Sequence, residues 1–198
     1  YVYEVPNEEN DTANITHRVL TVDPEDRSAV LLRLVQGEGK SIIFTRTKMT
    51  AERLSESLTT AGVPAARLHG DLNQNQRNRN LERFTKGYVR VLVATDVAAR
   101  GLDIKDVPAV FNFDVPFNAE DYVHRIGRTG RAGASGLAVT LVSPSDMRLV
   151  SDIEKLIKTK LQVEAYPLED DRSRGNFNEG RAEDRGEGRR DERRPERR

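Results

Sequence analysis

The chain has 198 residues, of which 36% are hydrophobic and 32% charged, so it can form one domain with a packed core and some additional polar sequence. Its 32 Lys and Arg balance 32 Asp and Glu, but residues 171–198 carry 10 Arg and 8 acidic residues, which leaves 22 basic and 24 acidic residues before them. This distribution excludes the broad basic surface of a free-standing nucleic-acid-binding domain, and the absence of cysteine excludes disulfides and thiolate metal sites. No apolar run is long enough for a membrane span and the first residues do not resemble a signal peptide, so we expect a cytoplasmic protein.

Apolar residues along most of the chain alternate between the period of strands and the period of helices. The predicted strands are 15–22, 41–44, 65–68, 89–94, 107–113 and 137–142. The predicted helices are one opened by Pro24 and ended by Gly37, then 49–61, 74–86, 119–126 and 146–160. This alternation predicts an α/β fold with a parallel sheet covered on both faces, in which ligands bind in the loops at the carboxyl ends of strands.

Gly39-Lys40-Ser41 is similar to the end of a phosphate-binding P-loop, but the full pattern would require a glycine at Leu34. A P-loop also follows a strand and opens a helix, whereas these residues leave a predicted helix and enter a predicted strand. We therefore interpret the glycines as the end of a helix. No other stretch fits the pattern, so the chain is not expected to hold a nucleoside triphosphate by itself.

The most distinctive pattern is His124–Arg131, which reads HRIGRTGR and lies at the end of a predicted helix. His124, Arg128 and Arg131 are spaced i, i+4 and i+7, so they would share one face for as long as the helix continues. The glycines would allow the backbone to approach a bulky anion closely. Guanidinium groups stabilise phosphate charge, and an arginine supplied to a nucleotide on another domain is an arginine finger. The alternative is a solvated basic helix end, which this dense pattern disfavours.

A second pattern, Val93–Ile104, leads from a predicted buried strand into a polar loop. Thr95 stands where the strand end would meet a ligand, and its hydroxyl can donate to a phosphate oxygen. Asp103 can accept from a ribose hydroxyl, as acidic residues do in dinucleotide-binding folds. For Asp96 we favour a simpler interpretation, the capping of a short helix.

These two patterns resemble motifs V and VI of superfamily 2 helicases, and specifically of DEAD-box ATP-dependent RNA helicases. Ser41–Lys48, which reads SIIFTRTK, is similar to motif IV, and His69–Asp71 followed by Gln74–Arg77 resembles the family's Gln-x-x-Arg motif. The matches occur in the family's order and spacing, and the likeness covers about residues 15–161, with wording closest to bacterial members. The resemblance implies a RecA-like parallel sheet with helices on both faces, and it identifies the chain as the second, C-terminal RecA-like domain of such a helicase.

The resemblance also implies a role for each matching residue. Arg128 and Arg131 would be catalytic and reach the γ-phosphate of ATP, with Arg131 as the arginine finger. Asp103 would hold the ribose, and His124 would link the two domains. The residues expected to contact or order the RNA backbone are Thr47, Gln74, Arg77, Thr95 and Arg100.

The implied cofactor is ATP with Mg²⁺, and the ion would be held mainly by an N-terminal RecA-like domain that carries the P-loop. The implied partners are single-stranded or duplex RNA and that N-terminal domain, with no membrane. Because this chain has no P-loop, it is expected to be inactive alone. Arg46 and Lys48 have no implied role and are interpreted as solvated.

The domain organisation follows from composition. Residues 1–168 are predicted to form the RecA-like domain, and residues 169–198 a disordered tail rich in Arg, Glu and Gly, because Phe177 is the one large apolar residue available there for burial. The arginines of the tail would contact RNA phosphates or simply be solvated among its acidic residues. Opening at Tyr1 without a start methionine suggests an excised domain.

Two other functions are considered. One is a non-catalytic module on the same fold that binds RNA or docks a partner; aromatic residues are only 6% and there is no Trp, so stacking surfaces for bases are scarce. A pure binder would also have no use for the arginines matched to a γ-phosphate. The other is DNA translocation by a different superfamily 2 branch, which the Gln-x-x-Arg and Arg-Gly-Leu-Asp-Ile wording disfavours.

Overall fold

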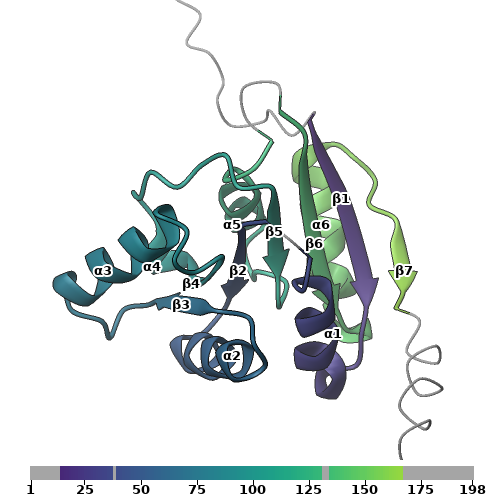
Figure 1. The fold of residues 1–198 in the computed structure, drawn as a ribbon. Helices are drawn as coiled ribbons and strands as arrows, with labels where there is room; N and C mark the ends of the chain where they lie inside the picture. The colour runs from purple at the N-terminus through teal and green to yellow at the C-terminus, as the bar shows by residue number, and fades with distance from the viewer. Residues whose placement is uncertain (1–13, 38, 131–133, 167–198) are drawn as a thin grey trace, which may run out of the picture. The chain divides into compact units, whose positions relative to one another are not determined.

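The computed structural model describes residues 14–37, 39–130 and 134–166. In this part of the chain, seven strands form one sheet in the order β3-β4-β2-β5-β6-β1-β7, and each neighbouring pair is parallel (Figure 1). The strands are β1 Ile15–Thr21, β2 Ser41–Thr45, β3 Ala65–Leu68, β4 Val91–Thr95, β5 Ala109–Asn112, β6 Gly136–Val142 and β7 Val163–Ala165. The predicted parallel sheet is confirmed.

Helices cover both faces of this sheet. They are α1 Arg27–Leu34, α2 Lys48–Thr60, α3 Gln74–Thr85, α4 Asp96–Ala99, α5 Ala119–Ile126 and α6 Met147–Ile157, with 3-10 turns η2 Pro24–Asp26 and η3 Pro144–Asp146. Figure 1 shows α1 and α2 on one face and α5 and α6 on the other. One apolar cluster joins α3 and α4 to β2, β3 and β4, and a second joins α5 and α6 to β1 and β6. Both clusters lie on one face of the sheet, because Ile42 of the first and Ala138 of the second align through Val110 in the strand register. Alternate strand residues such as Ile43 and Leu141 are also buried, so the sheet is packed on both faces.

Side-chain caps set where several helices begin. The Thr47 hydroxyl accepts from the backbone N–H of Thr50 at the start of α2. At the start of α3, Asn73 and Gln76 form a capping box, and Asn118 caps α5. Each cap satisfies a backbone donor that the first helical turn leaves unpaired. These caps place the loops at the carboxyl ends of β2, β3 and β5.

The predicted elements agree with the structure within a few residues, and β3 and α5 have the predicted bounds. Three elements differ from the prediction. The helix predicted from Pro24 begins as the turn η2, the helix predicted over 146–160 ends at Lys158 in a left-handed conformation, and β7 was not predicted. The residues of β7 are exposed, so only pairing with β1 gives them a strand conformation. The predicted tail, residues 169–198, lies outside the described residues.

The segment that is similar to a P-loop lies in the connection between α1 and β2. Gly39 has φ +120°, and Ser41 is the first residue of β2. The Lys40 ammonium donates to the Thr85 carbonyl oxygen at 2.8 Å and lies over the Phe84 ring. The Lys40 side chain is therefore engaged in contacts within the domain. In addition, no helix of the described residues is long and apolar enough to cross a membrane.

Candidate nucleotide and RNA site

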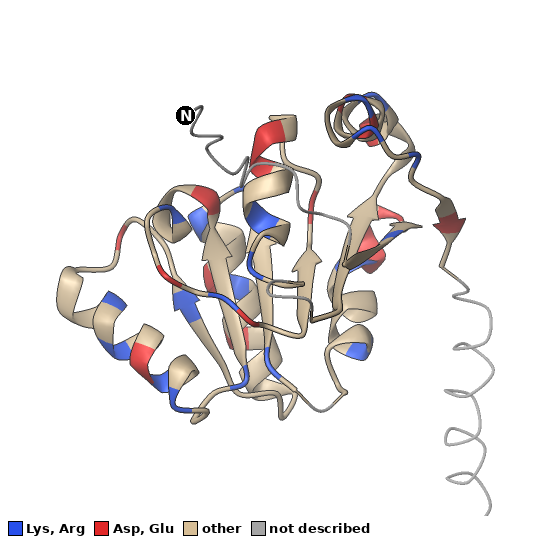
Figure 2. Cartoon of the chain, turned by 90° about the horizontal axis from the view of Figure 1, so that it is seen from above, with Lys and Arg blue, Asp and Glu red and all other residues tan. Residues whose placement is uncertain are grey.

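The predicted site residues that the structure describes lie in segments that follow the carboxyl ends of neighbouring strands. All strands are parallel, so their carboxyl ends meet at the same edge. Gln74 and Arg77 lie in the first turn of α3, which follows β3. Thr95 ends β4, and Thr47 follows β2. The strands β3, β4 and β2 are adjacent in the sheet. The next strand, β5, leads into α5 with His124. Figure 2 shows basic and acidic residues interspersed over the described elements. An anionic ligand would therefore be bound by individual basic side chains and not by a broad basic surface.

Thr47 begins α2 and is partly committed to the fold. Its hydroxyl oxygen lies 3.2 Å from the Thr50 backbone nitrogen and 2.9 Å from the Thr50 hydroxyl, and its carbonyl accepts from Thr45. The neighbouring Lys48 pairs with Asp71 at 3.0 Å, which ties this loop to the one after β3. Lys48 is half exposed, in line with its predicted solvation, but it is ion-paired.

Gln74 and Arg77 lie on an exposed, polar helix. Gln74 donates to Asn78 at 2.9 Å, and Arg77 approaches the Gly70 carbonyl at 3.5 Å. The Nε of Arg77 is buried and has no hydrogen-bond partner among the described residues. The Arg77 side chain is thus held near the start of α3 by a long hydrogen bond to Gly70.

The interpretation of Asp96 as a helix cap is wrong. Thr95 occupies the cap position of α4, and Asp96 is the first helical residue. The Asp96 carboxylate instead accepts two hydrogen bonds from the Arg125 guanidinium, at 2.6 Å and 2.8 Å. Hydrogen bonds between a guanidinium and a carboxylate are charge-assisted and stronger than neutral ones, so this pair is the main contact of the Asp96 side chain. Thr95 is buried at 8% exposure, and its hydroxyl makes no capping bond within the described chain.

Arg125 is the residue of this site that sequence reasoning missed. It is 1% exposed and also donates to the Asp114 carbonyl oxygen at 2.8 Å, while its guanidinium faces the Phe44 ring. It therefore joins the carboxyl ends of β4 and β5 to α5. The signal that could have found it is the pair of acidic residues, Asp96 and Asp114, that directly follow two buried strands.

The prediction that Arg46 is solvated is also wrong. Its side chain is 23% exposed, its Nε donates to the Val115 carbonyl oxygen at 2.6 Å, and its guanidinium lies over the Phe117 ring at 3.9 Å. A carboxylate oxygen of Asp146 lies 3.7 Å from its Nη2. The aliphatic part of an arginine can pack against apolar surface while its guanidinium finds acceptors. Here the Arg46 guanidinium finds its partners in the segments around Val115 and Asp146.

Opposite charges alternate beneath the site. The residues of this chain of charges are Arg27, Asp146, Arg46, Asp114, Arg125 and Asp96. Burial raises the pKa of Asp114, and this effect outweighs the backbone N–H of Arg46 and the guanidinium of Arg125, which act in the opposite direction. Burial therefore disfavours the charged form of the Asp114 carboxyl despite the arginines around it.

Arg100 and His124 meet at a shared carboxylate. Arg100 pairs with Asp121 at 2.9 Å, and His124 Nδ1 lies 3.9 Å from the same oxygen. Both are largely exposed, so they face outward where a second domain or a ligand can reach them. Asp103 is 84% exposed and has Lys105 at 3.8 Å, which leaves its carboxylate accessible.

Arg128 does not continue the face of α5, because the helix ends at Ile126 with Gly127 as its cap. Its Nη2 donates to the Ala99 carbonyl oxygen at 2.9 Å, and its Nη1 to the carbonyl oxygens of Leu102 and Ile104. The HRIGRTGR segment is thereby bound to the loop that carries Asp103. Arg131, the predicted finger, lies outside the described residues.

Glycines in and near this segment are required by packing. Gly130 has φ +69°, and a Cβ there would lie 2.6 Å from the Ile15 side chain. A Cβ on Gly136 would lie 2.6 Å from the backbone nitrogen of Gly130. These contacts are with β1 and β6, so the close approach that the glycines allow here is to the protein's own sheet.

A small pocket lies between the two motif segments, lined by Phe44, Asp96, Ala99, Arg100, Asp121, His124, Arg125 and Arg128. Its volume is about 10 Å³, which is room for about one water molecule. These residues therefore do not enclose a nucleotide by themselves. A ligand of that size would have to be covered from outside.

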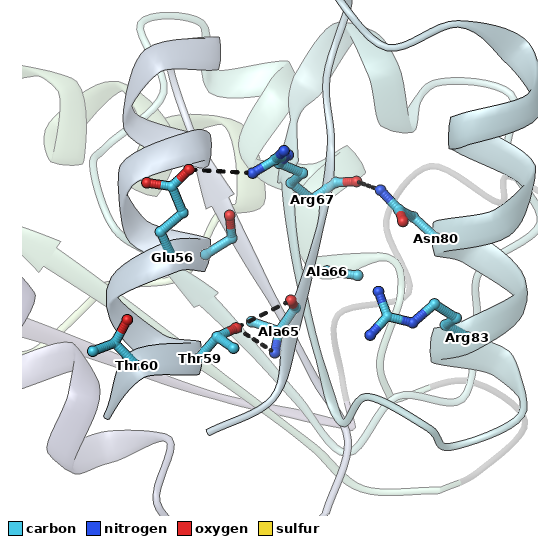
Figure 3. A pocket seen from close by; sticks show the side chains of 9 residues that line it. Glu56, Thr59, Thr60, Ala65, Ala66, Arg67, Asn80 and Arg83 are labelled. Carbon is cyan, nitrogen blue, oxygen red and sulfur yellow. Dashed lines mark hydrogen bonds and ion pairs between the residues drawn. The ribbon is translucent and has the colours of Figure 1, made fainter. Parts of the chain in front are cut away.

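A larger pocket of about 390 Å³ lies between α2 and α3 along the edge strand β3 (Figure 3). Its polar groups largely satisfy one another: Thr59 bonds the backbone of Ala65, Asn80 donates to the Arg67 carbonyl oxygen, and Arg67 pairs with Glu56. None of the predicted site residues lines it. These side chains cover the open edge of the sheet.

An all-parallel sheet between helical layers, with two arginine-containing segments joined at its carboxyl edge, has the architecture of a RecA-like domain. The family model of the helicase conserved C-terminal domain matches residues 26–133, more than half of the chain. The chain therefore belongs to the helicase C-terminal domain family.

Curated relatives are DEAD-box proteins. The chain is 42% identical over 156 residues to the DEAD-box ATP-dependent RNA helicase RhpA of Helicobacter pylori, covering 78% of this chain and 32% of the relative. It is 42% identical over 174 residues to CshA of Bacillus subtilis, covering 87% and 35%. The chain thus spans about a third of the length of these relatives.

Solved structures of the same family share the fold. A DEAD-box protein from Methanococcus jannaschii matches with a TM-score of 0.72 and 36% identity, over 78% of this chain and 42% of that one. The E. coli DEAD-box protein SrmB, solved in complex with regulator of ribonuclease activity A, matches with a TM-score of 0.69 and 39% identity, over 78% and 91%. The RecA-like fold of this domain is therefore shown.

Proposed function

We propose that this domain is the second RecA-like half of an ATP-dependent RNA helicase and supplies part of an interdomain ATP site and part of an RNA groove. The observation that carries the proposal is the attachment of Arg128 to the loop of Asp103. The Arg128 guanidinium thereby joins the loop of Asp103, a residue suited to ribose, to the segment that leads to Arg131. Family membership and the names of the relatives support the helicase assignment.

In this proposal ATP binds between this domain and a second domain that carries a P-loop. Arg131 would act as the finger that stabilises charge on the γ-phosphate in the transition state, with Arg128 beside it. Asp103, which is exposed, would accept from the ribose, and His124 would face the other domain. Guanidinium groups favour phosphate and repel cations, so Mg²⁺ would be held mainly by the partner domain.

The RNA would lie across the loops after β3, β4 and β2. Gln74, Arg77, Thr95, Arg100 and Thr47 offer amide, guanidinium and hydroxyl groups, which suit phosphates and sugars. Such contacts fix the strand without reading bases. Closure of two domains around ATP and a bent single strand would then separate short duplexes locally, in a cytoplasmic setting.

The alternative is a non-catalytic RNA-binding module on the same fold. A salt series distinguishes the two functions. The isolated chain, with and without residues 171–198, should bind single-stranded RNA weakly, with a shallow dependence on salt, because few cationic contacts release counterions. Tight binding by the tail-less domain, with a steep salt dependence, would favour the stand-alone module.

The helicase proposal is tested in the full-length protein with Arg77→Ala. This change should weaken the ATP-dependent RNA complex about equally for all RNA sequences and leave ATP binding without RNA unchanged, because the contact is to the backbone. Arg79→Ala is the matched control, since Arg79 is exposed on the same helix and has no predicted ligand. Equal losses for both variants would mean that α3 acts only through its overall charge.

A further inference from the structure

Phe117 is a large aromatic side chain that the fold holds out in solvent. It is 74% exposed, although the residues before it, Val115 and Pro116, are buried. The residue after it, Asn118, is fixed as the cap of α5, with its side chain accepting from Glu120. The loop on both sides of the ring is therefore anchored. The ring cannot easily withdraw into the core.

One face of this ring is covered by a fixed cation. The central carbon of the Arg46 guanidinium lies 3.9 Å from the ring centroid. That guanidinium also contacts the Val115 carbonyl oxygen at 2.6 Å and Asp146 at 3.7 Å. Because the ring is still largely exposed, its opposite face is open to solvent. Phe117 and Arg46 form a preorganised flat surface, which we call the Phe117 platform.

The platform continues the row of proposed RNA contacts. These contacts follow β3, β4 and β2, and β5, the next strand in the sheet, pairs with β2 and leads to Phe117. Neighbouring strands lie about 4.8 Å apart, so each loop is close to the next. Arg46 also directly precedes Thr47 in the sequence. An RNA strand whose backbone contacts Thr47 would therefore pass beside Arg46, which places one of its bases near the Phe117 ring.

We propose that the Phe117 platform stacks on one nucleobase of the single-stranded RNA held at the carboxyl edge of the sheet. The proposal rests on the RNA-binding function proposed above. Every base has a flat π face, so the contact selects an unpaired base without selecting its identity. It would be the one contact of this domain that reports whether a base is present, since the others address the backbone.

Abasic nucleotides test this directly. The affinity of the full-length protein, with a non-hydrolysable ATP analogue, is measured for RNA strands in which one abasic nucleotide is moved along the sequence. One position should weaken binding by about five- to a hundredfold, the range of base–aromatic stacking. Phe117→Ala should weaken binding of the intact strand by a similar factor, and should remove the effect of the abasic nucleotide at that position. Phe117→Trp should retain both the affinity and the abasic effect.

Tyr88→Ala is the matched control, because Tyr88 is 73% exposed but precedes β4, away from the carboxyl edge. If the loss of RNA affinity caused by Phe117→Ala multiplies with the loss caused by the abasic nucleotide at every position, the two act independently. That result would overturn the platform. A loss of ATP-analogue affinity without RNA would also overturn it and would assign Phe117 to contact with the other domain. If the wild-type protein shows no ATP-dependent RNA binding at all, the failure belongs to the proposed function instead.

Discussion

The Arg125 guanidinium donates two hydrogen bonds, 2.6 Å and 2.8 Å long, to the carboxylate of Asp96, which lies 29 residues earlier in the sequence. The arginine side chain is fully buried and the aspartate is 19% exposed. The pair joins α4, which follows Thr95, to α5, which leads to Arg128. The two segments matched to motifs V and VI are thus connected inside the domain, beneath the surface where their ligands are proposed to bind.

Arg125→Met should destabilise the isolated chain by about 3–5 kcal/mol, because it leaves the mostly buried carboxylates of Asp96 and Asp114 without their shared partner. Urea unfolding followed by circular dichroism measures this change. The control is Arg100→Met, which removes the exposed pair with Asp121 and should cost about 0–1 kcal/mol. Similar values for both variants would show that the buried pair contributes no more than a surface pair.

Gly136→Ala should destabilise the chain by about 1–3 kcal/mol, since the added Cβ would lie 2.6 Å from the Gly130 backbone nitrogen. It should also lower the ATPase rate of the full-length protein, because the displaced backbone leads directly to Arg131. Gly37→Ala is the control, as a Cβ there meets nothing within 4 Å. An unchanged unfolding midpoint for Gly136→Ala would contradict the packing argument.

Stability should fall as the pH drops below about 6.5, in part because of His17. Burial lowers the pKa of His17, whose Nδ1 lies 2.7 Å from the Tyr122 hydroxyl. Between the folded-state pKa and 6.5, the unfolded chain binds more protons than the folded chain, so this contribution is complete above 6.5 and is lost as the pH falls through that window. His17→Asn should flatten the pH dependence of the urea midpoint between pH 8 and pH 5. A parallel dependence in the variant and the wild type would assign the loss to other groups.

Arg131→Ala in the full-length protein should reduce kcat for RNA-stimulated ATP hydrolysis by roughly 10³-fold, the scale of arginine fingers. The affinity for ATP should change much less, because the interaction develops in the transition state. Arg148→Ala, at an exposed position of α6, should leave both quantities unchanged. A variant at Arg131 that loses ATP affinity but keeps its rate would be assigned to binding instead.

The chain's local periodicity was enough to predict the sheet and most helices. The bounds of β3 and α5 agree with the prediction because their signals are local: the apolar residues that define each element and the turn residues at its ends are close together in the sequence. The short helix α4 and the strand β7 depend on contacts with distant segments, and their own sequences carry little periodic signal. The pocket beside β3 likewise could not be predicted, since it arises from the separation of α2 and α3.

The sequence by itself determined the family, the order of the motifs and the loops that carry them, because these are properties of neighbouring residues. Only the tertiary structure decided which arginines bind the protein and which remain for a ligand. Arg125 and Arg128 belong to one motif, yet one is buried against Asp96 and the other binds loop carbonyls. Arg46 meets Val115, 69 residues away, and so becomes the base of an exposed aromatic platform instead of a solvated cation. A guanidinium has the same donors in every sequence context, and its role is decided by acceptors that folding brings from far along the chain.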